Sequence, residues 1–352
     1  MNDKIYDLII IGGGQSALAC AFFLRRKDID YIILDDQEQC GASWQHSWES
    51  LTLFSPAEHS SLPGWQMPET ENEFPTKPEV VDYLCKYEDR YDFPIKRPVK
   101  VTSVEKTDGV FNIETDKGKC KSKSVISATG TFQNPFIPEV PGRNKFEGEQ
   151  IHSSEYRKPE NFKDKRVVIV GEGNSGAQIL AEVSKVAETF WSTQDEPEYL
   201  PDDVDGRVLF DMASAKYYAE KKGEKFDSSK FNLGNIVMLP SVKDARARNV
   251  LNSKGQIKEI TENSVVWEDG SSQKVDVIIW CTGFGYSTSF LENLVSIDNK
   301  GKVPTDQTKS KETDGLWLVG YGGWTGFASA TIIGVGRSAK KTVKEVSEYL
   351  KV

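Results

Sequence analysis

Gly12-Gly13-Gly14-Gln15-Ser16-Ala17 directly follows the apolar run from Leu8 to Ile11. A second stretch, Gly171-Glu172-Gly173-Asn174-Ser175-Gly176, follows the run from Val167 to Val170 in the same way. Each fits the pattern G-x-G-x-x-G/A, in which the first glycine makes a tight turn, the second lets the backbone approach a pyrophosphate, and the third lets helix and strand pack closely. The pyrophosphate then lies on a helix N-terminus, where free N–H groups and the helix dipole favour negative charge. Two such turns in one chain predict two dinucleotide sites and electron transfer between their ligands.

The elements around the two turns predict parallel sheets. A strand at Ile5–Ile11, a helix at Ser16–Lys27 and a strand at Tyr31–Leu34 make one βαβ unit. A second unit begins at Val167 and continues into a strand at Thr189–Thr193. Further predicted strands cover residues 99–104, 110–114, 125–128, 265–267, 275–280 and 316–320, and helices cover residues 80–87 and those from about 328 onward.

These elements predict an α/β protein with two Rossmann-like dinucleotide-binding domains, the second inserted in the first. Residues 1–157 and 283–352 would form the first domain, and residues 158–282 the second. Within the second domain, about 196–247 is a charged and mostly helical insertion whose role the sequence does not reveal.

The composition is that of a globular protein that binds neither nucleic acid nor anionic membranes. The 352 residues carry a formal net charge of −9, whereas both of those partners require a basic surface. No apolar stretch approaches the ~18–20 residues needed to span a bilayer. The first predicted strand begins by Ile5, which leaves no room for a signal peptide. We therefore expect a cytoplasmic protein; its oligomeric state stays open, with a homodimer the commonest arrangement among soluble oligomers.

The five cysteines, at positions 20, 40, 85, 120 and 281, include no C-x-x-C pair. Such spacing indicates neither a zinc site nor a dithiol redox pair. We therefore expect five isolated thiols and no metal site. The closely spaced cysteine pair of many disulfide reductases with two dinucleotide sites is missing from the sequence.

The residues at the ends of the second strands bear on nucleotide choice. In this fold an acidic residue about 20 residues beyond the glycine turn binds a ribose hydroxyl. Asp35 lies there in the first unit, with Asp36 beside it as the alternative. The same step from the second turn reaches Gln194, preceded by Thr193. Because a neutral amide bonds a hydroxyl or a phosphate, whereas a 2′-phosphate favours arginine, we predict weak discrimination between NADH and NADPH.

A longer motif lies just before the second glycine turn. Residues Phe146 to Tyr156 read F-x-G-x-x-x-H-x-x-x-Y. This motif resembles the identifying motif of class B flavin-dependent monooxygenases, and its final Tyr resembles the flavin-containing monooxygenase branch of that family. Three further segments resemble the family's flavin-covering and domain-crossing segments: Gly41-Ala42-Ser43-Trp44, Ala128-Thr129-Gly130 and Thr282-Gly283-Phe284. The tracts at 48–56, 61–65, 200–207 and 320–330 are similar to those of short bacterial flavin-containing monooxygenases that accept NADH or NADPH, and to ArsO-type flavoproteins of arsenic-resistance operons.

The resemblance implies FAD in the first domain and NADH or NADPH in the second. The implied FAD contacts are Gly12, Gly14, Gln15, Ser16, Ala17, Asp35, Trp44, His46, Val101 and Thr129. The implied NAD(P)H contacts are Gly171, Gly173, Asn174, Ser175, Gly176, Thr193 and Gln194. Two positions depart from the family pattern. Phe54 stands where many members have an Asn near the flavin, and no Asp follows Gly320, which leaves the ribityl contact unassigned.

The activity that the resemblance implies is an FAD-dependent monooxygenase reaction with NADH or NADPH and O2. A C4a-hydroperoxyflavin would oxygenate small soft nucleophiles or ketones, by sulfoxidation or Baeyer–Villiger oxidation. Such an intermediate requires a dry site, and six aromatic residues would suit its lining or serve only as packing: Trp44, Trp48, Phe54, Trp65, Trp324 and Phe327. Phe54 favours an alternative, a flavin-dependent NAD(P)H reductase or oxidase that releases hydrogen peroxide or serves a partner protein. A non-catalytic dinucleotide sensor is a third hypothesis.

The sequence points to no catalytic acid, base or nucleophile, because hydride transfer from nicotinamide to flavin requires none. His152 is the candidate to consider, since it lies within the family motif. We interpret it as a structural link between the domains. Asn174 is expected either to bond near the flavin or to cap the helix that it begins.

Overall fold

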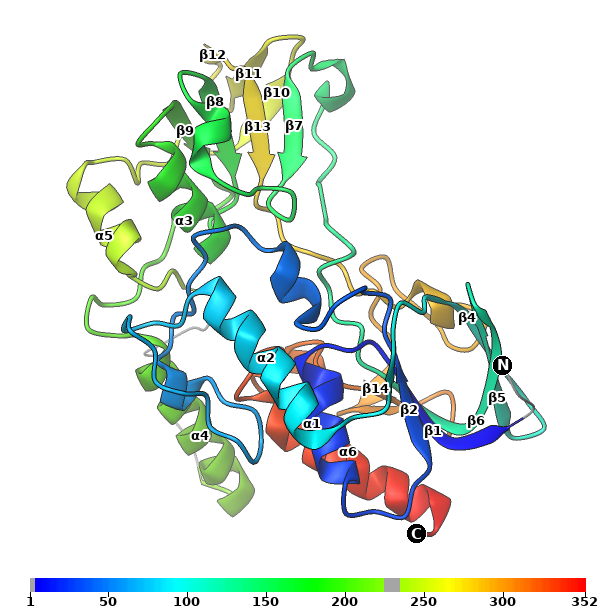
Figure 1. Ribbon diagram of the computed structural model, residues 1–352. Coiled ribbons are helices and arrows are strands. Elements are labelled where there is room, and N and C mark those ends of the chain that lie inside the picture. Colours follow the sequence, from blue (N-terminus) through cyan, green and yellow to red (C-terminus); the bar gives the residue numbers. More distant parts are fainter. Residues whose placement is uncertain (1–3, 225–234) are drawn as a thin grey trace. The chain divides into compact units, whose positions relative to one another are not determined.

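The computed structural model describes residues 4–224 and 235–352, which form two compact units (Figure 1). The first unit comprises the chain up to His46 together with Pro56–Asn134 and Phe284–Val352. The second comprises Ser47–Ser55 and Pro135–Gly283. Each unit contains a sheet with parallel strands and a glycine turn between a strand and a helix. The predicted α/β class with two Rossmann-like folds is confirmed.

The first unit is built on a nine-stranded sheet in which β1 lies between β6 and β2. These three strands are parallel, so their carboxyl ends meet at one edge of the sheet. The strands are β1 (Ile5–Ile11), β2 (Tyr31–Leu34), β3 (Ile95–Lys96), β4 (Val101–Thr107), β5 (Val110–Thr115), β6 (Gly118–Ser127), β14 (Thr305–Asp306), β15 (Lys309–Ser310) and β16 (Leu316–Leu318). The helices are α1 (Gln15–Leu24), α2 (Lys77–Tyr91) and α6 (Val335–Leu350), of which α1 and α6 pack side by side (Figure 1).

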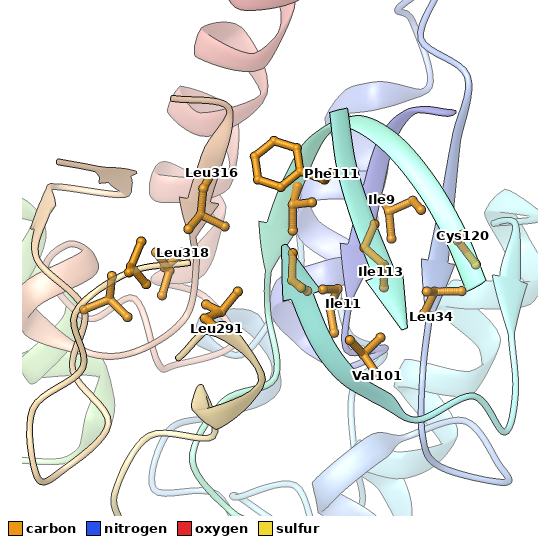
Figure 2. Close-up of a cluster of buried hydrophobic side chains, with 14 of the residues drawn as sticks. Ile9, Ile11, Leu34, Val101, Phe111, Ile113, Cys120, Leu291, Leu316 and Leu318 are labelled. Carbon is orange, nitrogen blue, oxygen red and sulfur yellow. The ribbon is translucent and has the colours of Figure 1, made fainter. Parts of the chain in front are cut away.

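A buried apolar cluster lies between β1 and the hairpin of β4 and β5. Ile9 and Ile11 share one face of β1 because side chains alternate along a strand, and Figure 2 shows them beside Ile113 of β5. Leu316 and Leu318 of β16 extend the same cluster. This core supports the strands whose ends carry the first glycine turn.

The second unit has a four-stranded parallel sheet of order β7-β13-β8-β9 and a separate three-stranded antiparallel sheet. The parallel strands are β7 (Glu149–His152), β8 (Arg166–Val170), β9 (Glu188–Ser192) and β13 (Val277–Trp280). The antiparallel strands are β10 (Ile257–Ile260), β11 (Ser264–Trp267) and β12 (Ser272–Lys274). The helices are α3 (Asn174–Val183), α4 (Gly206–Lys222) and α5 (Pro240–Ala247). The predicted insertion contains α4 and α5, and its residues 225–234 lie outside the described residues.

Several predicted boundaries are wrong. The helix expected over 16–27 is α1, which ends at Leu24, and the last helix begins at Val335 rather than near 328. Strand β6 starts at Gly118, seven residues before the predicted strand at 125. Its first half alternates exposed lysines with buried Cys120, Ser122 and Ser124. The period of two is therefore present, but small polar residues on the buried face conceal it from a search for apolar alternation.

The prediction of five isolated thiols is also wrong. Cys40 and Cys85 form a disulfide, although 45 residues separate them in the sequence. Cys20, Cys120 and Cys281 are free and buried, as expected. The pair meets because α2 lies beside the segment that follows β2, and no local pattern predicts such a contact. Among the described residues, none of the helices combines the length and the apolar character that a membrane span requires.

Candidate cofactor-binding sites

The first glycine turn joins the end of β1 to α1. Gly12 has a φ of +100°, and a Cβ atom there would lie 2.6 Å from the carbonyl oxygen of Ala128 at the end of β6. Only glycine fits such a close approach in the left-handed region. Gly14 is the N-cap of α1 in extended conformation, without a side-chain capping bond. The first N–H groups of α1 are therefore available to an anion.

A cavity of about 640 Å³ opens at this turn, where β1, β2 and β6 end. Its volume lies within the range of about 300–1,000 Å³ that is typical of ligand sites. Nine of the ten predicted FAD contacts line it: Gly12, Gly14, Gln15, Ser16, Asp35, Trp44, His46, Val101 and Thr129. Ala17 does not line the cavity; it is buried in the first turn of α1.

Asp35, an acidic residue of the cavity wall, belongs to a buried network of ion pairs. Asp35 is only 2% exposed, and its Oδ2 accepts a 2.6 Å bond from Nε of Arg97. The remaining guanidinium nitrogens of Arg97 donate to both carboxylate oxygens of Glu88 on α2, at 2.7 and 2.8 Å. Burial raises the pKa of Asp35 above its usual value, while Arg97 opposes that rise. Asp36, which also lines the cavity, accepts bonds from Gln37 and Gln133.

Two short chains of contacts order the cavity wall. Trp44 donates from its indole nitrogen to the side-chain oxygen of Gln15 at 3.0 Å, and the Gln15 amide donates to the carbonyl of Ala330 at 2.8 Å. The ring of His46 stacks on Phe132, whose ring stacks in turn on Phe284. These residues come from segments far apart in the sequence, so the wall depends on the assembled unit.

Sequence reasoning missed the part of the wall that follows Phe284. Tyr286, Ser287, Ser289 and Phe290 line the cavity. The hydroxyl oxygen of Ser287 is buried and has no hydrogen-bond partner. A buried polar atom of this kind requires an acceptor or donor from elsewhere, and a dinucleotide in the cavity would provide one. Together with the glycine cradle and the uncapped helix, this orphaned hydroxyl makes the residues present a good fit for FAD.

The second glycine turn repeats the first in the second unit. Gly171 has a φ of +124°, and a Cβ atom there would lie 2.3 Å from the carbonyl oxygen of Cys281. A Cβ on Gly176 would lie 2.1 Å from the carbonyl oxygen of Gly171, whereas one on Gly173 would meet nothing within 4 Å. Trp191 on β9 donates to the Gly171 carbonyl at 2.9 Å and holds the turn. The space above Gly173 suits the approach of a pyrophosphate.

The chain at the end of β9 has two buried residues, which are followed by exposed ones. The hydroxyls of Ser192 and Thr193 bond to the 253–255 segment, and both residues are buried. Gln194 and Asp195 are exposed, and the Gln194 N–H donates to the carboxylate of Glu172 at 3.1 Å. Thr193 and Gln194 were both predicted to contact NAD(P)H, and of these two Gln194 is the one whose exposed side chain can reach a ribose.

Asn174 does not cap α3, which was one of the two roles expected for it; the other, a bond near the flavin, stays a prediction. The N-cap of α3 is Gly173, and Asn174 is the first residue of the helix. Its side-chain oxygen accepts the N–H of Val237 at 2.9 Å, and its amide donates to the carbonyl of Asn235 at 3.4 Å. Asn174 therefore fastens the segment that leads into α5 to the glycine turn.

The family motif is a structural element of the second unit. His152 ends β7 and is 1% exposed. Its Nδ1 accepts the N–H of Ser154 at 3.1 Å, so the proton is on Nε2, which donates to the carbonyl of Gly283 at 2.9 Å. Burial lowers the pKa of His152 below its usual value, so the ring is neutral at pH 7. Tyr156 at the other end of the motif is fully buried, and its hydroxyl donates to Glu182 on α3.

The six aromatic residues of the predicted lining are divided between the two units. Trp44 lines the cavity. Trp65 packs on Tyr83 of α2, and Trp324 packs on Tyr286 and Tyr321. Trp48 packs on Tyr156 and Phe54 stacks on Phe210, in both cases within the second unit. Four of the six thus have an aromatic packing partner within their own unit, and a lining shared by the set stays a prediction.

Comparisons with known proteins agree with this architecture. The model of the pyridine nucleotide-disulphide oxidoreductase family matches residues 9–199, and that of flavin-binding monooxygenase-like proteins matches residues 226–305. The uncharacterized oxidoreductase CzcO of Bacillus velezensis is 30% identical over 97% of this chain and 99% of its own length. The structure of a flavin-containing monooxygenase from Stenotrophomonas maltophilia is 43% identical, with a TM-score of 0.90 over 98% of this chain and 99% of that one.

A more distant relative, which is also named a flavin-containing monooxygenase, has a longer chain than this protein. Human flavin-containing monooxygenase 5 is 26% identical over 82% of this chain and 64% of its own length. The two bacterial proteins match this chain over almost the whole length of each partner. From the family models, these relatives and the two glycine turns, we conclude that the chain is an enzyme of the class B flavin-dependent monooxygenase family, with FAD and NAD(P)H as its cofactors.

Proposed function

We propose that this monooxygenase uses NADH or NADPH and O2 to oxygenate small soft nucleophiles such as thioethers, and ketones. The observation that carries the proposal is the chemistry of the cavity wall in the first unit. Its described lining contains no cysteine, and the Cys40–Cys85 disulfide is not part of it. A flavin held there has no cysteine pair in the wall to reduce, which favours O2 as the electron acceptor.

The chain's own residues would bind and orient the cofactors. When bound, FAD supplies electron transfer from the nicotinamide to O2 and the insertion of one oxygen atom into the substrate. We assign FAD to the domain of residues 1–157 and 283–352, with its pyrophosphate on the N-terminus of α1 and its ribose near Asp35 or Asp36. The Ser287 hydroxyl would donate to the same ligand. We assign the nicotinamide cofactor to residues 158–282, with its pyrophosphate over Gly173.

The choice between the two nicotinamide cofactors depends on Gln194 and its surroundings. Its exposed amide can bond either a ribose hydroxyl or a 2′-phosphate. The carboxylates of Glu172 and Asp195 lie beside it and repel a phosphate, which shifts the choice towards NADH. We expect kcat/KM values for NADH and NADPH that differ by less than ~100-fold, roughly 2.7 kcal/mol. Steady-state kinetics with both cofactors measures this ratio, and a preference of more than ~100-fold for NADPH would contradict the proposal.

The alternative function, an oxidase or reductase, rests on Phe54. Phenylalanine has no side-chain amide to offer a flavin at this position. The ring of Phe54 stacks on Phe210, and its carbonyl accepts the N–H of Gly206. The two functions differ in the fate of the electrons. We would measure NADH consumption, hydrogen peroxide and sulfoxide with a panel of simple thioethers, using protein that purifies yellow. Sulfoxide in near-equal amount to the NADH consumed supports the monooxygenase, whereas near-total conversion to hydrogen peroxide supports the oxidase.

We also propose that the protein acts in the cytoplasm, as a homodimer, on small molecules. The net charge of −9 supports an absence of nucleic-acid and anionic-membrane partners. Size-exclusion chromatography with light scattering would test the dimer, and a single species at the mass of one chain, 39.4 kDa, would contradict it.

A further inference from the structure

A disulfide ties the wall of the FAD cavity to a neighbouring helix. Cys40 and Cys85 have Cα atoms 5.2 Å apart. Cys40 lies two residues before the 3₁₀ turn Ala42–His46, and Cys85 lies in the middle of α2. The disulfide therefore joins two segments that meet only in the folded first unit.

The segment on the Cys40 side forms part of the cavity wall. Four of its residues line the cavity: Ala42, Ser43, Trp44 and His46. Its backbone is unusual, because Gly41 and Ala42 both have positive φ, of +83° and +46°. A non-glycine residue keeps such a conformation only where surrounding contacts impose it. The disulfide at Cys40 is one of those contacts, and the bond from the Gln45 amide to the Cys40 carbonyl is another.

The segment on the Cys85 side is helix α2, which is capped and packed against the first unit. Helix α2 begins with a capping box formed by Thr76 and Glu79 and buries Tyr83, Leu84 and Tyr87. One turn beyond Cys85, Glu88 binds Arg97, which binds the cavity residue Asp35. Helix α2 thus supports the cavity at two places, through an ion pair at one and through a disulfide at the other.

The disulfide joins two residues that lie partly at the surface of the first unit. Both Cys40 and Cys85 are partly exposed, and neither lines the cavity. The free thiols of Cys20, Cys120 and Cys281 are buried, and burial raises their pKa values, which suppresses the reactive thiolates. In the cytoplasm, the location proposed above for this protein, disulfides are usually transient or redox-sensing. The pair is therefore placed to exchange with a thiol in solution.

We propose that the Cys40–Cys85 disulfide is a reducible tether of the cavity wall, and that its reduction lowers the affinity of the enzyme for FAD. The co-reactant is a low-molecular-weight thiol. Its thiolate attacks one sulfur and forms a mixed disulfide, and a second thiol displaces the protein sulfur. The net exchange converts one protein disulfide and two small thiols into two protein thiols and one small disulfide, a transfer of two electrons and two protons. The inference concerns FAD binding only, so it would stand even if the proposed oxygenation proved wrong.

Thermodynamic linkage makes the inference quantitative. If reduction weakens FAD binding by a given factor, bound FAD must make the disulfide harder to reduce by the same factor. We expect a factor of about five or more, the lower end of typical couplings between sites. The ratio of reduced to oxidised dithiothreitol that half-reduces the disulfide should then be larger by that factor in the FAD-loaded protein than in the protein without FAD.

The test measures thiols and FAD release on the same samples. Native holoenzyme is treated with dithiothreitol, the reagent is removed, and exposed thiols are counted with a chromogenic disulfide reagent. The FAD dissociation constant is then measured by the fluorescence of released FAD. We expect two additional fast-reacting thiols and a dissociation constant about fivefold or more higher than that of the untreated protein.

The variant Cys40→Ser/Cys85→Ser is the matched control, with Cys85→Ser as a second variant if the first folds poorly. The double variant should bind FAD as weakly as the reduced wild type and should not respond to dithiothreitol. Three results would overturn the inference: no gain of two thiols without denaturant, an unchanged FAD dissociation constant after reduction, or a dithiothreitol response that persists in the double variant. None of these measurements uses a substrate or oxygen, so they separate this inference from the proposed oxygenation.

Discussion

At the scale of single residues, the most consequential group is the buried trio of Asp35, Arg97 and Glu88. Burial raises the pKa of both carboxyls, and the shared guanidinium opposes the rise. Because Arg97 makes three bonds to two carboxylates, removing it would leave two buried charges without a partner. Such a loss is costly, since breaking a buried ion pair on one side strands the other charge.

We therefore expect Arg97→Met to reduce the free energy of unfolding by about 3–5 kcal/mol at pH 7.5. Without Arg97 the folded-state pKa values of Asp35 and Glu88 rise further above their unfolded values of about 4. An acid whose pKa is higher in the folded than in the unfolded state destabilises the fold as the pH rises from the unfolded pKa to the folded one. The loss of unfolding free energy in Arg97→Met should therefore be smaller near pH 5, where the two carboxyls hold protons. Urea unfolding at both pH values measures this. Arg97→Lys, which keeps the charge, is the control, and an equal deficit at both pH values would count against the argument.

His152 gives a prediction of the opposite sign. Its pKa is lowered in the folded state by burial, so the unfolded state binds a proton first as the pH falls below about 6.5. Folding stability should therefore decline below that pH, with a contribution of up to about 1.4 kcal/mol per pH unit. The variant His152→Gln keeps an amide donor for the Gly283 carbonyl but cannot titrate. We expect a flatter dependence of its unfolding free energy between pH 6.5 and 5.5, and a slope equal to that of the wild type would refute this explanation.

At the scale of the elements, the first β1–α1 turn separates a folding requirement from a binding requirement. Gly12→Ala places a Cβ 2.6 Å from the Ala128 carbonyl in a left-handed conformation, which should cost about 1–3 kcal/mol from the backbone alone. Gly14 has an ordinary φ of −81°, and a Cβ there would lie 3.4 Å from the Cβ of Ala42. We expect Gly14→Ala to fold with a melting temperature near that of the wild type and to bind FAD about tenfold or more weakly, a loss of 1.4 kcal/mol.

Thermal melting and FAD titration of the two variants, side by side, test this division. Gly12→Ala should lose thermal stability as well as FAD, because the clash lies in the protein itself. If Gly14→Ala bound FAD as tightly as the wild type, the pyrophosphate would not approach α1 at this residue.

At the scale of the whole molecule, the two units should divide the two cofactors between them. A Cβ on Gly173 meets nothing within 4 Å, so Gly173→Ala leaves the second unit intact and obstructs only the approach of a pyrophosphate. We expect this variant to purify with a full complement of FAD and to have a KM for NADH raised about tenfold or more. Gly14→Ala should have the converse effect, with weaker FAD binding and an unaltered second turn. Flavin absorbance and steady-state kinetics measure both effects, and loss of FAD from Gly173→Ala would argue against separate sites.

The sequence by itself determined the class of the fold and the position of both glycine turns. It also predicted ten residues around FAD, nine of which line the cavity. These signals are local, because a positive φ at Gly12 or an apolar run at Leu8–Ile11 follows from residues that are neighbours in the chain. Assembly of the units decided the rest. Three contacts join residues that are tens of positions apart: the Cys40–Cys85 disulfide, the bond of Arg97 to Asp35 and the bond of Val237 to Asn174. The buried Ser287 hydroxyl without a partner is likewise visible only in the folded unit. Such contacts depend on which helices and strands meet in the folded unit, and the apolar periodicity of one segment does not specify its partner.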